Sequence, residues 1–225
     1  HRDDARLLLL AGYGVWAGRH VREEVGMALG VAGQMVNEAA RRRDLDLTMM
    51  AHRALGTSRT MAGRLDDAGV SFEQARALYD PTRHRALALG TGTDPIVGLD
   101  SYQALATLAS GHLDRARAMA DAALAGSQAD GQPINARAYG LWHVSLTAML
   151  VRGSAKAGAL AEGVEALARD RGLSFWEALA GSLVGWARLD AGDPAGAVTG
   201  MSDSLAAAAA TGSGILGGLL KSVLA

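Results

Sequence analysis

The chain contains no cysteine, which excludes a disulfide framework, a thiolate metal site and a cysteine nucleophile. An excess of charge of one sign is missing too, because 22 basic residues stand against 23 acidic ones. This balance gives no electrostatic footprint for nucleic acid or for an anionic membrane, so we expect neither as a partner. Aromatic residues make up only 4% of the chain, which suits thin layers of helices packed through Ala and Leu.

Strand-like alternation and spanning apolar runs are also absent. The uncharged stretch 204–220 is shorter than the roughly 20 apolar residues of a spanning helix and is diluted by four glycines. We interpret it as two packed helices joined near residues 211–214. No secretory signal is visible, and the chain begins at His1. We therefore expect a cytoplasmic fragment of a larger multidomain protein.

Small residues recur along the chain at one place in a helical pattern. They are Ala28, Ala68, Ala116, Gly158 and Ala197, at spacings of 40, 48, 42 and 39 residues. Such periods are typical of two-helix solenoid repeats. Small residues are expected at helix crossings, because a larger side chain there would strain two closely packed axes.

Apolar residues at three- and four-residue spacing predict helices almost everywhere. The sequence thus predicts an all-α fold, an α-solenoid of about five antiparallel helix pairs followed by an unpaired terminal helix. We expect a single domain over 1–225, because a repeat array has one continuous core. The repeats are expected at 4–43, 46–80, 95–128, 133–171 and 174–211, and the terminal helix at 213–225.

Local signals mark several helix ends. Ser174 with Glu177 has the spacing of a capping box, and Asp193-Pro194 predicts an acidic cap with proline in the first turn. The longest spacing must be absorbed between residues 79 and 95, which we expect to be partly helical over 82–89 and to project from one edge. Arg83 and Arg85 would contact a partner or a carboxylate of the neighbouring repeat; the alternative is a packed spacer without function.

One segment carries most of a known repeat signature, in the residues Leu55, Gly56, Gly63, Ala68, Phe72 and Ala75. At these positions the chain resembles a tetratricopeptide (TPR) array. Partial matches follow at Trp142 with Gly153 and at Val184-Gly185 with Ala197. The spacings exceed that family's usual period of about 34 residues. The resemblance implies a noncatalytic protein–protein interaction module.

A narrower resemblance covers roughly residues 20–190. The segments 52–56, 78–81, 84–87 and 92–95 are similar to the C-terminal arrays of bacterial adenylate/guanylate cyclases or transcriptional regulators fused to an AAA-type ATPase. This resemblance implies a sensor or scaffold module of a bacterial signalling regulator. Its partner would be a protein, a peptide or another domain of the parent chain.

Catalytic constellations are incomplete. Gly90-Thr91-Gly92 lacks the third glycine and the preceding strand of a dinucleotide loop, and no Gly-Lys-Ser/Thr phosphate loop exists. The histidines show no pair at the one-turn spacing of a helical zinc site. His20 near Glu23 and Glu24 is interpreted as a helix-end ion pair. We expect no enzyme, no cofactor and no metal.

Partner contacts are expected on the outward side of the first helix of each pair and in the long connection. The candidates are Arg53, Thr57, Arg59, Arg83, Arg85, Tyr102, Gln103, Asn135, Arg137 and Tyr139. The tryptophans are interpreted as packing residues, with a ligand platform as the alternative. A second hypothesis is a small helical ligand-binding domain or enzyme with a closed pocket. A repeat scaffold should instead form an open ribbon without convergent titratable groups.

Overall fold

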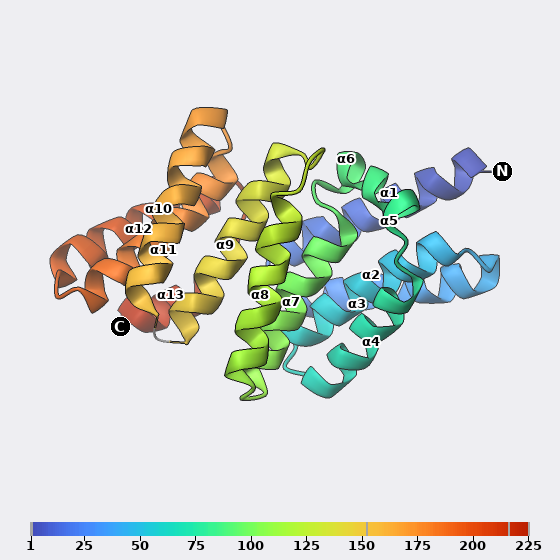
Figure 1. Ribbon diagram of the computed structural model, residues 1–225, viewed down its shortest axis with the longest axis horizontal. Helices are drawn as coiled ribbons and strands as arrows, with labels where there is room; N and C mark the ends of the chain where they lie inside the picture. The colour runs from blue at the N-terminus through green and yellow to red at the C-terminus, as the bar shows by residue number, and fades with distance from the viewer. Residues whose placement is uncertain (1, 152, 216, 225) are drawn as a thin grey trace.

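The computed structural model describes residues 2–151, 153–215 and 217–224, and every secondary-structure element in these ranges is a helix (Figure 1). The helices form five consecutive pairs, which confirms the expected α-solenoid. The pairs are α1 (Arg2–Val21) with α2 (Val25–Arg42), α3 (Leu45–Met61) with α4 (Leu65–Leu78), α7 (Pro95–Ala109) with α8 (Leu113–Ser127), α9 (Ile134–Leu150) with α10 (Ser154–Arg171), and α11 (Ser174–Asp190) with α12 (Pro194–Ala210).

The terminal helix α13 (Gly217–Leu224) is shorter than expected. It begins at Gly217 rather than near residue 213, and the chain turns after α12 at Gly212, which adopts a positive φ of 78°. Residues 1, 152, 216 and 225, which fall inside the predicted domain, lie outside the described residues.

Small residues set the spacing of the helices, as the repeat pattern predicts. Ala68 and Ala116 are fully buried, and Ala197 is nearly so. A Cβ atom on Gly56 would lie 2.6 Å from the ring of Phe72. A Cβ atom on Gly158 would lie 2.9 Å from the Cβ atom of Ala187. Larger side chains at these positions would force neighbouring helices apart.

Carboxylates cap several helices. Asp44 accepts a hydrogen bond from the amide of Leu47, and Asp193 accepts one from the amide of Gly196, so the acidic cap before Pro194 is confirmed. The capping box at Ser174 is wrong. The N-cap position of α11 belongs to Leu173 and makes no side-chain cap, because only Leu173 separates the left-handed Gly172 from α11.

The long connection folds into three short helical segments, α5 (Pro81–His84), η1 (Arg85–Leu87) and α6 (Ala88–Thr91). Its partly helical character was expected. His84 is buried, with Nδ1 accepting from the Asp80 amide at 2.8 Å and Nε2 2.9 Å from Asp46. At the other end, a Cβ atom on Gly90 would lie 2.7 Å from Leu10, so the connection packs against α1.

The array is closed rather than open. In Figure 1, α1 runs from the right of the view behind the middle of the array. The amide of Gly214, between α12 and α13, donates a hydrogen bond of 2.8 Å to the carbonyl of Val21 at the end of α1. Val21 and Ile215 also pack against one apolar cluster with Trp176 of α11. The expectation of an open ribbon is therefore wrong for the concave side.

Candidate functional site

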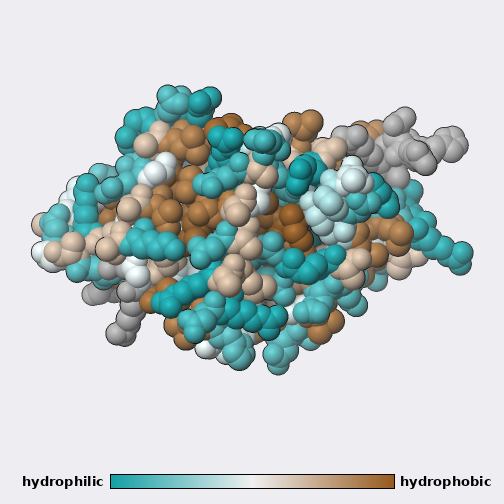
Figure 2. All heavy atoms as spheres, in the orientation of Figure 1, coloured by the Kyte–Doolittle hydropathy of each residue, from teal (hydrophilic) through white to brown (hydrophobic). Residues whose placement is uncertain are grey.

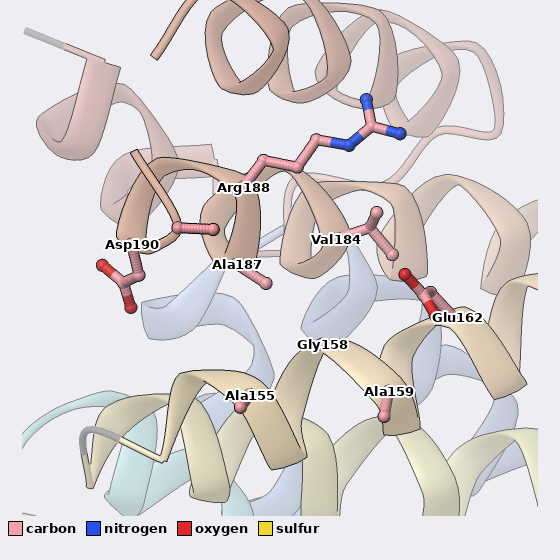
Figure 3. Close-up of a pocket in the computed structure, with 9 residues that line it drawn as sticks. Ala155, Gly158, Ala159, Glu162, Val184, Ala187, Arg188 and Asp190 are labelled. Atoms are coloured by element: carbon pink, nitrogen blue, oxygen red, sulfur yellow. The ribbon is translucent and has the colours of Figure 1, made fainter. Parts of the chain in front are cut away.

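A hollow of about 450 Å³ lies between α10 and α11 (Figure 3). Its floor is made of small side chains, and apolar atoms gather over this part of the array in Figure 2. The charged residues Glu162, Arg188 and Asp190 at its rim are exposed, and Arg188 extends away from the other two in Figure 3. This groove brings no polar groups together.

The second hollow lies among the first helices of all five pairs and has a volume of about 160 Å³. Seven of the chain's ten Phe, Trp and Tyr residues line it, together with two histidines and one arginine. We call it the aromatic pocket, and its lining comprises Tyr13, Trp16, Ala17, His20, Val21, Arg53, Thr91, Tyr102, Tyr139, Trp142, His143, Phe175, Trp176, Leu179 and Ile215. A chain poor in aromatic residues thus concentrates them in one place.

Helical spacing explains how these side chains meet. Tyr13, Trp16 and His20 follow each other at three and four residues on α1, so they share one face. Tyr139 and His143 are four residues apart on α9, and their rings stack with centroids 4.1 Å apart. The inner helices turn these faces toward one another, and Ile215 closes the pocket from the other end of the chain.

Arg53 of α3 is the charged centre of the aromatic pocket. Its side chain is 2% exposed, and Nη1 donates a hydrogen bond of 2.8 Å to the Tyr13 hydroxyl. Its Nε has no hydrogen-bond partner, and no carboxylate forms an ion pair with it among the described residues. Gly98 of α7 makes room for it, because a Cβ atom there would fall on the guanidinium. A buried cation without a counterion is costly.

Both histidines of the pocket are neutral near pH 7. Burial lowers the pKa of His143 to about 3, against the opposing effect of its bond to the Tyr139 carbonyl. Burial, with a smaller contribution from Arg53, lowers the pKa of His20 to about 4. Because a carbonyl only accepts, Nδ1 of His143 donates to Tyr139 at 2.9 Å. Its Nε2 is therefore a lone-pair acceptor, and it has no partner.

The remaining polar groups separate into paired and unpaired ones. The Tyr102 hydroxyl lies 2.6 Å from Nε2 of His20, and burial raises the pKa of Tyr102 well above its ordinary value. The indole nitrogens of Trp16 and Trp176 donate to Ser58 at 2.9 Å and to Asn135 at 2.6 Å. The indole nitrogen of Trp142 is buried and has no partner. Three buried polar atoms of the lining, on Arg53, Trp142 and His143, are thus left unpaired.

The structure divides the expected partner residues into three groups. Arg53, Tyr102 and Tyr139 line the aromatic pocket, and Asn135 holds Trp176 in its wall. Arg83, Arg85 and Arg137 are exposed. The other three are used in packing, contrary to the expectation of outward side chains; they are Thr57, Arg59 and Gln103.

Arg83 and Arg85 contact carboxylates within the chain. Arg83 pairs with Asp46, and Nε of Arg85 lies 3.6 Å from the buried carboxylate of Asp94 at the start of α7. The ion pair expected between His20 and Glu24 is wrong, because Glu24 pairs with Arg19 and Arg22 instead. His143 and Tyr13 were missed altogether, although their spacing from Tyr139 and Trp16 is a helical-face signal.

Comparison with known proteins adds the fold type. The sequence matches no protein-family model and no curated protein. Among solved structures it is similar to TPR-like repeats from a Podosopora anserina protein assigned as a kinesin light chain, with 16% identity and a TM-score of 0.54, over 89% of this chain and 94% of that one. The fold is TPR-like. The fusion to a cyclase or an AAA-type ATPase stays a prediction.

Among the described helices, none combines the length and the apolar character of a membrane-spanning segment. Within the same part of the chain, no three or more His, Asp and Glu residues lie together as a metal site would require.

Proposed function

We propose that this chain is a noncatalytic sensor module, a TPR-like scaffold that binds a small effector in the aromatic pocket and passes the binding event to a protein partner. In this proposal it belongs to a cytoplasmic bacterial signalling regulator, and the partner is a peptide, a protein or another domain of the parent chain. The observation that carries the proposal is that seven aromatic side chains line one pocket together with a buried Arg53, which has no carboxylate partner among the described residues.

Binding fits the chemistry of the pocket better than catalysis does. A general acid or base works best with a pKa near the working pH. The pKa values of His20 and His143 are lowered to about 4 and about 3, while burial raises those of Tyr102 and Tyr139. These groups therefore keep fixed protonation states near neutral pH. They hold a ligand by shape and hydrogen bonds rather than exchange protons with it.

The position of the pocket also supports a sensor. Its lining comes from α1, α3, α7, α9 and α11 and from Ile215. A bound effector would contact every repeat and both ends of the closed array. Ligands shift a conformational equilibrium through such differential contacts. Closure at Gly214 and Val21 is the element that binding would strengthen, and the exposed Arg83, Arg85 and Arg137 remain candidate partner contacts on the outside.

A pocket-filling variant tests the proposal. Ala17 of α1 lines the pocket, so Ala17→Trp should occupy the ligand's space, whereas Ala11→Trp on the exposed side of α1 should not. We expect a panel of small cationic, neutral and anionic aromatic compounds to include at least one that raises the thermal midpoint of the wild type and of Ala11→Trp, but not of Ala17→Trp. Equal responses of all three proteins to every compound would show that the pocket binds none of them.

A further inference from the structure

We infer that the aromatic pocket is built for a small carboxylate with one flat ring and a hydrogen-bond donor at its far end, of which a hydroxylated aromatic acid is the type. The inference rests on the proposed function, because it names the ligand class of the same pocket. Its basis is the arrangement of one charged group and two unpaired polar atoms among aromatic walls.

Charge selects an anion. Rings of Trp and Tyr alone form cages that suit cations such as quaternary ammonium groups. Here Arg53 lines the same cavity, has no carboxylate partner among the described residues, and leaves its Nε unpaired. A cationic ligand would add like charge in a desolvated space, whereas a carboxylate would supply the missing counterion and accept from the guanidinium.

Hydrogen bonding defines both ends of the ligand. Nε of Arg53 and Nε1 of Trp142 are buried donors without a hydrogen-bond partner, on residues that line the pocket. Nε2 of His143 is an unpaired acceptor, because its proton lies on Nδ1 and is donated to the Tyr139 carbonyl. A ligand that satisfies all three needs a carboxylate and a separate O–H or N–H group. A carboxylate alone, or an O–H or N–H group alone, would leave at least one of the three atoms without a partner.

Size and walls select a single ring. The cavity of about 160 Å³ is close to the engineered cavity of about 150 Å³ that holds benzene in another protein. The stacked rings of Tyr139 and His143 and the edge-on ring of Trp176 provide flat apolar walls. The small volume suits a free small acid better than a large ligand.

Titration of the whole chain with matched probes tests this class. The probes are para-hydroxybenzoate, benzoate, the neutral para-hydroxybenzamide, benzyltrimethylammonium and a short peptide with a C-terminal phenylalanine, with binding followed by calorimetry and by tryptophan fluorescence. We expect para-hydroxybenzoate to bind at least about tenfold more tightly than the amide, because the amide loses the charge-assisted bonds to Arg53. Benzoate should be intermediate, and the cation should not bind.

Variants assign the atoms. Arg53→Met should abolish the preference for the acid over the amide, and Arg137→Met, which removes an exposed arginine from α9, should leave it unchanged. His143→Phe should lower the affinity for para-hydroxybenzoate to that for benzoate without changing the latter. Without ligand, Arg53→Met should keep or raise the thermal midpoint, because it removes an uncompensated buried charge.

The contrary outcomes are distinct. Saturable binding of the amide, the cation or the peptide at least as tight as that of the acid would overturn the carboxylate assignment and leave the proposed sensor function standing. A lower midpoint of ligand-free Arg53→Met, with no acid bound by the wild type at millimolar concentration, would make Arg53 a structural residue and overturn the inference. Failure of every compound of the wider panel to bind in the pocket would overturn the proposed function as well.

Discussion

At the scale of single residues, the lining of the aromatic pocket carries an energetic cost. Arg53 is buried without a counterion, and Trp142 and His143 each bury a polar atom without a partner. Such groups are rare in folded proteins because each loses its water contacts without replacement. Trp16 and Trp176 show the ordinary solution, since their indole nitrogens donate to Ser58 and Asn135. Buried polar atoms without a partner also occur outside the pocket, for example on Arg59 and Ser101, so it is their grouping around one cavity that sets Arg53, Trp142 and His143 apart.

The two pocket histidines should make stability depend on pH. Their folded-state pKa values, about 4 for His20 and about 3 for His143, lie below the ordinary value of 6.5. The two histidines therefore do not lower the free energy of unfolding above about pH 6.5. They lower it as pH falls toward the folded-state pKa values, because the unfolded chain takes up protons first. We expect a fall of up to about 1.4 kcal/mol per pH unit and per histidine between about pH 6.5 and 5.

Urea unfolding at a series of pH values measures this dependence. His143→Phe should show a smaller slope than the wild type in that window, since one of the titrating groups is removed; His52, whose pKa burial also lowers, adds to the slope of both proteins. Equal slopes for both proteins would contradict the assignment of a neutral, buried His143. A wild type whose stability is flat over the window would contradict it for both histidines.

At the scale of helices, the repeat register read from small residues agrees with the structure. Ala68, Ala116 and Ala197 occupy buried crossings, and Phe72 fills the space left by Gly56. The capping box failed for a local reason. The turn between α10 and α11 is so short that the backbone of Ser174 is already helical, and its hydroxyl cannot act as a cap. Spacing alone does not reveal where the turn begins.

The register predicts the effect of overpacking. Ala68→Leu adds bulk at the fully buried crossing of the second pair, so we expect it to lower the free energy of unfolding by about 1 to 3 kcal/mol. Ala77→Leu, on the exposed side of the same helix, is the matched control and should change it by less than about 0.5 kcal/mol. Chemical denaturation of the two variants gives both values, and equal stability would refute the crossing at Ala68.

At the scale of the whole molecule, the closure was beyond the reach of the sequence. Helix pairs and their order follow from local periodicity, but the winding of the array depends on small rotations added from pair to pair. The pocket also depends on this winding and could not be predicted from local periodicity. Tyr13, Arg53, Tyr102, Tyr139 and Trp176 come from five different helices, and each alone has the pattern of an ordinary packing residue. Arg53, Tyr102 and Tyr139 were chosen as partner residues on an outward face, whereas the structure brings them together inside.

The closed arrangement also predicts the effect of a bound ligand. It would contact α1, α9, α11 and Ile215 at once and would stabilise the contact between Gly214 and Val21. Protection from hydrogen exchange reports local opening of such contacts. The outer helices α4 and α8 contribute no residue to the pocket lining and serve as internal references.

Hydrogen exchange with and without an aromatic acid tests whether the five inner helices converge on one ligand site. Para-hydroxybenzoate at a concentration that just saturates the wild type should slow exchange together in peptides covering α1, α3, α7, α9, α11 and residues 213–215, leave α4 and α8 unchanged, and slow exchange less in Arg53→Met. Slowing confined to a single helix pair, or an equal response of Arg53→Met, would contradict this prediction.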